Sequence, residues 1–222
     1  TLAFVKLTDG HASYAFYDEN TAGRMLSADD LPDVQPQTLF VGGISLAVEP
    51  CAQAYEALVE RHAKDAVIMM DPNVRPSFIA DEAAFRARMT RMLGQCDIVK
   101  LSDEDLAWFM PDDSTENAAK RLVAGGVKLL CITQGSQGIT AYTPNHQVFV
   151  PSEKATVVDT VGAGDTFNAG VLASLHHADA LYKDKIATLD EATVRDALAF
   201  GAKVAAITVS RAGANPPWAS EL

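Results

Sequence analysis

The chain has 222 residues, of which 48% are hydrophobic and 21% are charged, as in an ordinary globular protein. Its formal net charge of −11 argues against nonspecific binding to nucleic acids or to anionic membranes. No apolar run reaches the roughly 18 residues that a transmembrane helix needs. We therefore expect neither a nucleic acid nor a membrane as a partner.

The first thirty residues are typical of β structure. Segments 1–8 and 13–18 are strand-like and flank a turn at Asp9-Gly10-His11, which predicts a hairpin. The sequence begins without Met and directly in strand-like residues. We therefore expect it to continue a longer chain whose N-terminal part lies before these residues.

From residue 38 onward, apolar runs alternate with amphipathic stretches. The runs predict strands over 38–43, 66–71, 97–101 and 127–133. The stretches between and after them predict helices from Pro50, over 81–94, 103–110 and 115–125, and then over 165–178 and 190–209. Two short segments, 138–143 and 147–150, predict an antiparallel addition near the sheet edge. Near-continuous apolar strands separated by helices indicate a mainly parallel sheet covered on both faces, so the chain 1–222 is predicted to be one α/β domain.

Three cysteines are spread along the chain without the spacing of a metal site. Cys51, Cys96 and Cys131 each fall in or beside an apolar segment, which favours buried free thiols. Free thiols suit a reducing compartment, so we expect a cytoplasmic protein.

Polar residues and glycines follow one predicted strand after another. In an open parallel sheet, ligands bind outside the carboxyl ends of the strands. The residues at these ends are Gly42, Gly43 and Ser45; Asp71, Asn73 and Arg75; Ser102 and Asp105; Thr133, Gly135, Ser136 and Gly138. Each group alone could simply reflect the residue preferences of a turn, but their recurrence after successive strands predicts a common site.

The segment DTVGAGDTFNAG, residues 159–170, carries the clearest chemistry. The N–H groups of Gly162, Ala163 and Gly164 at a helix start can hold a transferring phosphoryl group. Asp165 can take the proton from an attacking hydroxyl; the alternative is that it only caps the helix. The segment is neither a GxxxxGK[ST] loop nor a GxGxxG loop.

DTVGAGDTFNAG resembles the C-terminal signature of the ribokinase-like (PfkB) sugar kinases. TQGSQG at 133–138, KLSDEDL at 100–106 and ITVSRAGA at 207–214 match further positions, so the resemblance extends over essentially the whole chain. It implies a ribokinase-like three-layer fold, with a mainly parallel central sheet flanked by helices and a small β lid. Residues 1–20 would be the lid-proximal strands, and the rest of the lid would lie in the family's N-terminal part.

The resemblance also implies roles for residues of this chain. Asp165 would be the catalytic base beside an anion hole formed by Gly162, Ala163 and Gly164. The ATP site would be formed by Thr133, Gly135, Ser136, Gly138 and Ser102, with Gly201 and Ala202 near adenine. The reaction would be in-line transfer of the γ-phosphoryl group of MgATP to a sugar hydroxyl.

The same resemblance also implies sites for two metal ions. Ser102 and Asp105 match the family's Asn-x-x-Glu element, which is associated with Mg²⁺ and phosphate. Because Asp105 is shorter than Glu, contact with Mg²⁺ through water is easier to imagine than direct contact. Asp159 and the carbonyl groups of Val161 and Gly213 match a site for a monovalent cation such as K⁺.

Within the family, DPNVRP at 71–76 and FYDENTAGRML at 16–26 most resemble fructokinases and 2-dehydro-3-deoxygluconate kinases. Asn73, Arg75 and Phe16 would lie near the substrate, although Arg75 could instead hold its loop through an ion pair. The keto-acid kinases carry a basic residue where this chain has Asp18. An aspartate there would repel a substrate carboxylate, so we expect fructose as the acceptor.

A catalytically silent relative that only binds or senses sugar is the main alternative, and the intact Asp165 and glycines argue against it. A dinucleotide-dependent enzyme is a second alternative, but the chain has no GxGxxG after an early strand. The lid strands of the family often pair between subunits, so a homodimer through residues 1–18 is also expected.

Overall fold

The structure is a computed structural model that describes residues 2–8 and 11–222. Asp9 and Gly10 of the predicted turn therefore lie outside the described residues. For residue 3 and for residues 5–8 and 11–16 only the backbone is described.

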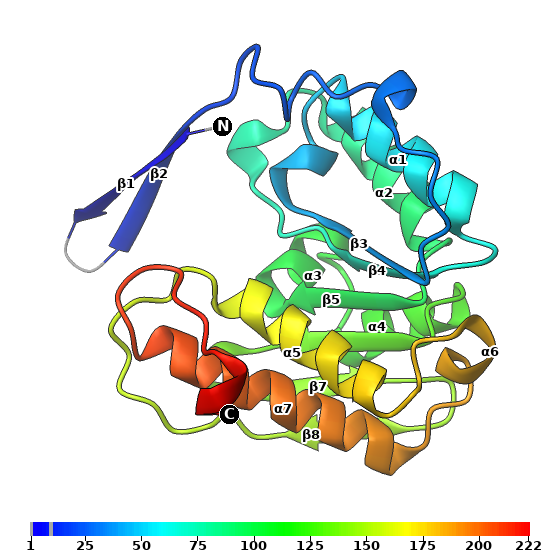
Figure 1. Ribbon diagram of the computed structural model, residues 1–222, viewed down its shortest axis with the longest axis vertical. Coiled ribbons are helices and arrows are strands. Elements are labelled where there is room, and N and C mark those ends of the chain that lie inside the picture. The colour runs from blue at the N-terminus through cyan, green and yellow to red at the C-terminus, as the bar shows by residue number, and fades with distance from the viewer. Residues whose placement is uncertain (1, 9–10) are drawn as a thin grey trace.

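The N-terminal segment forms a separate antiparallel hairpin, as predicted. Strands β1 (Leu2–Thr8) and β2 (His11–Tyr17) pair in a two-stranded sheet. Figure 1 shows this hairpin standing apart from the main sheet. Phe4 and Tyr17 are exposed, and their rings meet edge to face with centroids 5.5 Å apart.

The remaining strands form one mixed six-stranded sheet with the order β3-β4-β5-β6-β7-β8. Four of them are parallel: β3 (Thr38–Gly42), β4 (Val67–Asp71), β5 (Ile98–Ser102) and β6 (Leu129–Thr133). The last two, β7 (Ile139–Tyr142) and β8 (Gln147–Val150), add an antiparallel edge. The sequence predicted a mainly parallel sheet with an antiparallel addition near its edge, and the strand pairings confirm both features.

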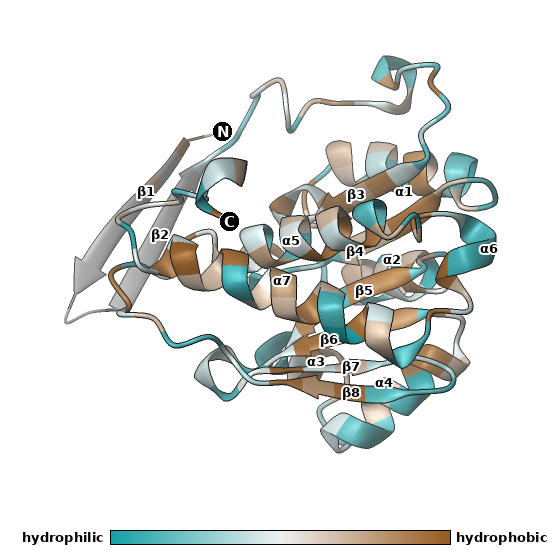
Figure 2. Cartoon of the chain, turned by 60° about the horizontal axis from the view of Figure 1, so that its bottom comes forward, coloured by the Kyte–Doolittle hydropathy of each residue, from teal (hydrophilic) through white to brown (hydrophobic). Residues whose placement is uncertain are grey.

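Helices cover both faces of this sheet. One face packs against α1 (Cys51–His62), α2 (Glu82–Leu93), α3 (Asp103–Phe109) and α4 (Thr115–Ala124). The other packs against α5 (Ala163–His177), α6 (Lys183–Ile186) and α7 (Glu191–Val209). The views agree on this three-layer arrangement (Figures 1 and 2). Short α6 was not predicted, because four residues are too few to show a helical period.

Alternation along the strands divides the core between the two layers. On β4, Ile68 and Met70 face the α1–α4 layer, whereas Val67 and Met69 face α5 and α7. Figure 2 shows the central strands as predominantly hydrophobic. Helices α5 and α7 approach closely, since a Cβ atom added to Gly170 would lie 2.7 Å from the Cα atom of Gly201.

The three cysteines are buried free thiols, as predicted. Burial raises the pKa of each thiol, and that of Cys131 to about 12, so all three remain protonated at neutral pH. In the described part of the chain, no helix is both long enough and apolar enough to cross a membrane.

Helix α5 begins at Ala163, two residues before its predicted start at 165. The reason is Gly162, which takes a left-handed conformation with a φ of 81° and serves as the N-cap. Asp165 is therefore the third residue of the helix and does not cap it. Because β3 to β6 are parallel, their carboxyl ends share one edge of the sheet, and the start of α5 lies at that edge with them.

Candidate active site

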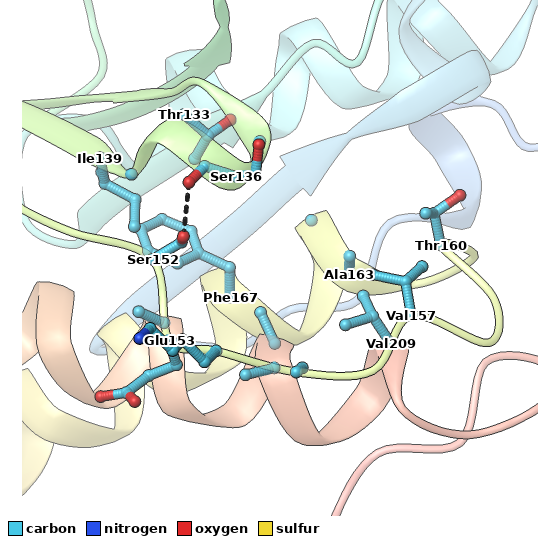
Figure 3. Close-up of a pocket in the computed structure, with 18 residues that line it drawn as sticks. Thr133, Ser136, Ile139, Ser152, Glu153, Val157, Thr160, Ala163, Phe167 and Val209 are labelled. Carbon is cyan, nitrogen blue, oxygen red and sulfur yellow. Dashed lines mark hydrogen bonds between the residues drawn. The ribbon is translucent and has the colours of Figure 1, made fainter.

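A cavity of about 590 Å³ lies between the end of β6, the start of α5 and helix α7. This volume lies within the range of about 300–1,000 Å³ that small-molecule sites occupy. Figure 3 shows Thr133 and Ser136 on one side of the cavity, with Val157 and Val209 on another. Most of its lining is apolar, as is typical of small-molecule sites.

The glycine-rich loop after β6 forms one wall of the cavity. Gly135 and Gly138 have φ values of 54° and 117°, which favour glycine. A Cβ atom on Gly138 would lie 2.5 Å from the carbonyl oxygen of Val150. The Ser152 hydroxyl donates a hydrogen bond of 2.6 Å to the carbonyl oxygen of Ser136 (Figure 3). These contacts fix the loop against the segment that follows β8.

The start of α5 adjoins the same cavity through Ala163 and Gly164. No side chain caps this 15-residue helix, so the positive end of its dipole faces the cavity and can attract an anion. The N–H group of Ala163 donates to the carbonyl oxygen of Thr160 at 3.3 Å. Asp165 follows directly and is exposed. An uncapped helix start and an exposed carboxylate therefore lie side by side.

Beneath this helix start lies a buried polar network. Asp71, at the end of β4, accepts a hydrogen bond of 3.1 Å from Lys100 Nζ and one of 2.8 Å from the side-chain amide of Asn168. All three side chains are at least nine-tenths buried. Burial raises the pKa of Asp71, and the Lys100 ammonium opposes that rise.

Asp105 joins two loops at this edge of the sheet. Its carboxylate accepts a hydrogen bond of 2.9 Å from the N–H group of Val74 and one of 3.0 Å from that of Ser102. The side chain is buried. Asp105 therefore holds the loop that carries Asn73 and Arg75 against the start of α3, and its Mg²⁺ role stays a prediction.

Asp105→Ala should destabilise the fold. The substitution leaves the N–H groups of Val74 and Ser102 without their acceptor, and a buried unsatisfied donor costs about 1–3 kcal/mol. Urea unfolding followed by circular dichroism would measure this loss, with the exposed Asp112→Ala as the control. A loss of less than about 0.5 kcal/mol, typical of an ordinary surface substitution, would contradict the role given to Asp105.

Asp159 joins the segment before α5 to the loop after α7. Its two carboxylate oxygens accept hydrogen bonds from the N–H groups of Val161 at 3.0 Å and Gly213 at 2.9 Å. These bonds lower the pKa of Asp159. The three residues expected around a monovalent cation are therefore neighbours.

The loop after β4 presents a basic side chain near the site edge. The N–H group of Asn73, which has a φ of 45°, donates to Asp71 Oδ1 at 3.2 Å. Arg75 is exposed and donates to the carbonyl oxygen of Val74 at 3.0 Å. Across residues 2–8 and 11–222, Arg75 forms no ion pair, and its Nη1 atom also donates to the carbonyl oxygen of Asn73 at 3.4 Å.

The Asp18 carboxylate is paired through one oxygen only, because its Oδ2 atom is buried without a hydrogen-bond partner among the described residues. It is buried, and its Oδ1 atom lies 3.1 Å from Arg24 Nη1. Arg24 compensates much of the charge, so Asp18 repels a substrate carboxylate less than expected. The side chain of Phe16, the other residue expected near the sugar, lies outside the described residues.

The structure brings most of the expected nucleotide-site residues to one cavity. Those that line it are Thr133, Gly135, Ser136, Gly138, Ala163, Gly164 and Ala202. Ser102, Gly162 and Gly201 do not line it, and Gly201 instead packs against Phe167. Residues that the sequence analysis missed include Ser152, Glu153, Lys154, Thr160, Phe167 and Val209. Phe167 and Val209 lie on the predicted helices at 165–178 and 190–209, and their helical period could have placed them on the inner face.

The chain is similar to known carbohydrate kinases along nearly its whole length. The model of the pfkB family carbohydrate kinases matches residues 2–221. A fructokinase of Rhizobium leguminosarum bv. trifolii is 51% identical over 198 residues, which cover 88% of this chain and 61% of that protein. The chain therefore spans less than two thirds of the length of that relative.

Solved structures agree with the family match. The ATP-bound fructokinase of Xylella fastidiosa has a TM-score of 0.83 and 27% identity, covering 96% of this chain and 68% of that one. A double mutant of the Vibrio cholerae O395 fructokinase, bound to fructose, ADP and potassium, has a TM-score of 0.82 and 26% identity, with the same coverage of 96% and 68%. The fold is thus the ribokinase-like α/β fold expected from the sequence, and the chain belongs to the pfkB family of carbohydrate kinases.

Proposed function

We propose that the protein is an ATP-dependent fructokinase. The observation that carries this proposal is the uncapped start of α5, where Asp165 follows the anion site and the large cavity adjoins it. The similarity to the Rhizobium fructokinase supports fructose as the acceptor. Arg75, in the loop after β4, is exposed, and its hydrogen bonds within the described chain use only the Nη1 atom of the guanidinium, which fits a role in binding the substrate.

In this proposal, ATP lies in the cavity with its phosphates directed to the start of α5. Asp165 accepts the proton of the attacking sugar hydroxyl while that oxygen forms a bond to the γ-phosphorus atom. The bond between this phosphorus and the β,γ-bridging oxygen breaks, and ADP leaves. The N–H groups of Gly162, Ala163 and Gly164 stabilise the charge on the transferring phosphoryl group.

Mg²⁺ would be held mainly by the phosphates of ATP. Mg²⁺ commonly binds one or two carboxylates together with substrate phosphates and water. Among the residues that the structure describes, no group of three or more His, Cys, Asp or Glu side chains could hold a metal ion. Both oxygens of Asp105 already accept backbone hydrogen bonds, which favours contact through water.

K⁺ is proposed to bind beside Asp159, with the carbonyl groups of Val161 and Gly213 as further ligands. The carboxylate of Asp159 is already positioned between these two residues, and a carboxylate oxygen can serve more than one partner. The potassium ion bound to the Vibrio fructokinase supports K⁺ as the kind of ion.

We further propose a homodimer that forms through the hairpin β1–β2. Exposed Leu2, Phe4 and Tyr17 on a hairpin apart from the main sheet support it, because an unpaired sheet edge can pair with a second copy. The three buried free thiols support a reducing location such as the cytoplasm.

Coupled ADP release with MgATP tests the function, with fructose and 2-dehydro-3-deoxygluconate supplied in parallel. We expect turnover with fructose because the Rhizobium fructokinase is 51% identical over 88% of this chain. Turnover with the keto acid alone would contradict fructose as the acceptor but would still support a carbohydrate kinase. If neither compound gave turnover, the alternative of a catalytically silent relative that only binds or senses sugar would be favoured.

A further inference from the structure

Lys100 occupies an unusual place for a lysine. It lies on the central strand β5 with only 5% of its surface exposed, and its backbone is paired with Cys131 of β6. Alternation along the strand directs it to the α5 side, where Ile98 also packs. A charged group in a sheet core is costly unless it is paired.

The pairing is with Asp71, and it does not by itself account for the lysine. Replacing a buried ion pair by apolar residues of similar volume is often neutral or stabilising, so stability alone does not require this pair. The ammonium has three N–H donors, of which the bond to Asp71 uses one. Asn168 completes the network, and its Oδ1 atom is buried without a partner in the described residues.

The ammonium lies directly against the first turn of α5. A Cβ atom added to Gly164 would be 3.2 Å from Lys100 Nζ but 4.0 Å from Asp71 Oδ2. The positive group is thus closer to the helix start than the negative group. Near the uncapped positive end of a helix, an ammonium is unfavourable alone but favourable once an anion binds.

We propose that Lys100 is a further phosphate-binding residue, whose Nζ atom donates to the γ-phosphoryl group of ATP at the start of α5. Asp71 and Asn168 are positioning residues that hold the ammonium beside Gly164. This inference rests on the proposed kinase function. It also explains why residue 164 is a glycine, since a side chain there would separate the ammonium from the phosphoryl group.

The test compares the wild-type protein with Lys100→Met and with the double variant Lys100→Met/Asp71→Asn. The double variant removes the ammonium without leaving a buried unpaired carboxylate, so it keeps the proposal testable where the single variant fails to fold. The exposed Lys64→Met is the control. Affinities for ADP and for the non-hydrolysable analogue AMP-PNP are measured by calorimetry, and turnover with fructose is measured alongside.

We expect AMP-PNP affinity to fall about 10- to 100-fold in the double variant, as for a lost hydrogen bond to a charged group. ADP affinity should change much less, because ADP lacks the γ-phosphoryl group, and kcat should fall about 10²- to 10³-fold. Equal losses for both nucleotides, or unchanged affinities, would overturn the role of Lys100. If the wild-type protein itself had no turnover with any sugar, the proposed function would fail instead.

Discussion

Asp165→Asn should abolish most of the turnover while leaving the fold intact. The amide keeps the size of the side chain but cannot accept the proton of the sugar hydroxyl. Loss of a general base costs about 10²–10⁴-fold in rate. Asp165 is exposed at the third position of α5, so its replacement leaves no buried group unpaired.

The measurement is kcat with saturating MgATP and fructose, together with the thermal unfolding midpoint. Asp196→Asn is a matched control, because Asp196 is an exposed aspartate on the neighbouring helix α7. Asp165→Asn should keep its affinity for ATP, since the proposed anion site uses backbone N–H groups and not the Asp165 side chain. A kcat within threefold of wild type would remove Asp165 from the role of base.

Gly162→Ala should lower both stability and turnover. The residue has a φ of 81°, and a left-handed conformation costs an alanine about 1–2 kcal/mol. An added Cβ atom would also lie 3.1 Å from the Cβ atom of Ala214. Relief of this contact would shift the first turn of α5, and misplacing one donor of an anion hole costs about 10²-fold or more in kcat.

Gly23→Ala is the control for this substitution, because a Cβ atom at Gly23 meets nothing within 4 Å and the residue has no positive φ. Urea unfolding and fructose-dependent turnover would be measured for both variants. Wild-type stability together with wild-type kcat in Gly162→Ala would show that the left-handed N-cap is not needed. A loss of stability without a loss of kcat would remove Gly162 from the catalytic geometry.

Local sequence patterns predicted most of the fold. The apolar runs at 66–71 and 127–133 show as strands because both faces of each strand are buried. The start of α5 was misplaced by two residues, since a left-handed glycine N-cap has no pattern that separates it from a loop glycine. The cavity wall at 152–160 is irregular, so no period marked it.

The buried network shows the limit of such prediction for the site. Asp71 is 29 residues from Lys100 and 97 from Asn168, so only the folded sheet reveals that they meet. Asp18 is a second example. Its ion pair with Arg24 reduces the negative charge that Asp18 presents, and the sequence alone did not reveal this pair. The glycine-rich motifs at 133–138 and 159–170, in contrast, could be located from the sequence, because local backbone conformations that favour glycine leave glycines in the sequence.

The most direct test of the proposed kinase is to identify the product. The purified protein would be incubated with MgATP and fructose, and the reaction followed by ³¹P NMR. The transfer proposed at Asp165 predicts one sugar phosphate for each ADP formed, with no accumulation of inorganic phosphate. ADP accompanied only by inorganic phosphate, or no ADP at all, would contradict phosphoryl transfer to the sugar.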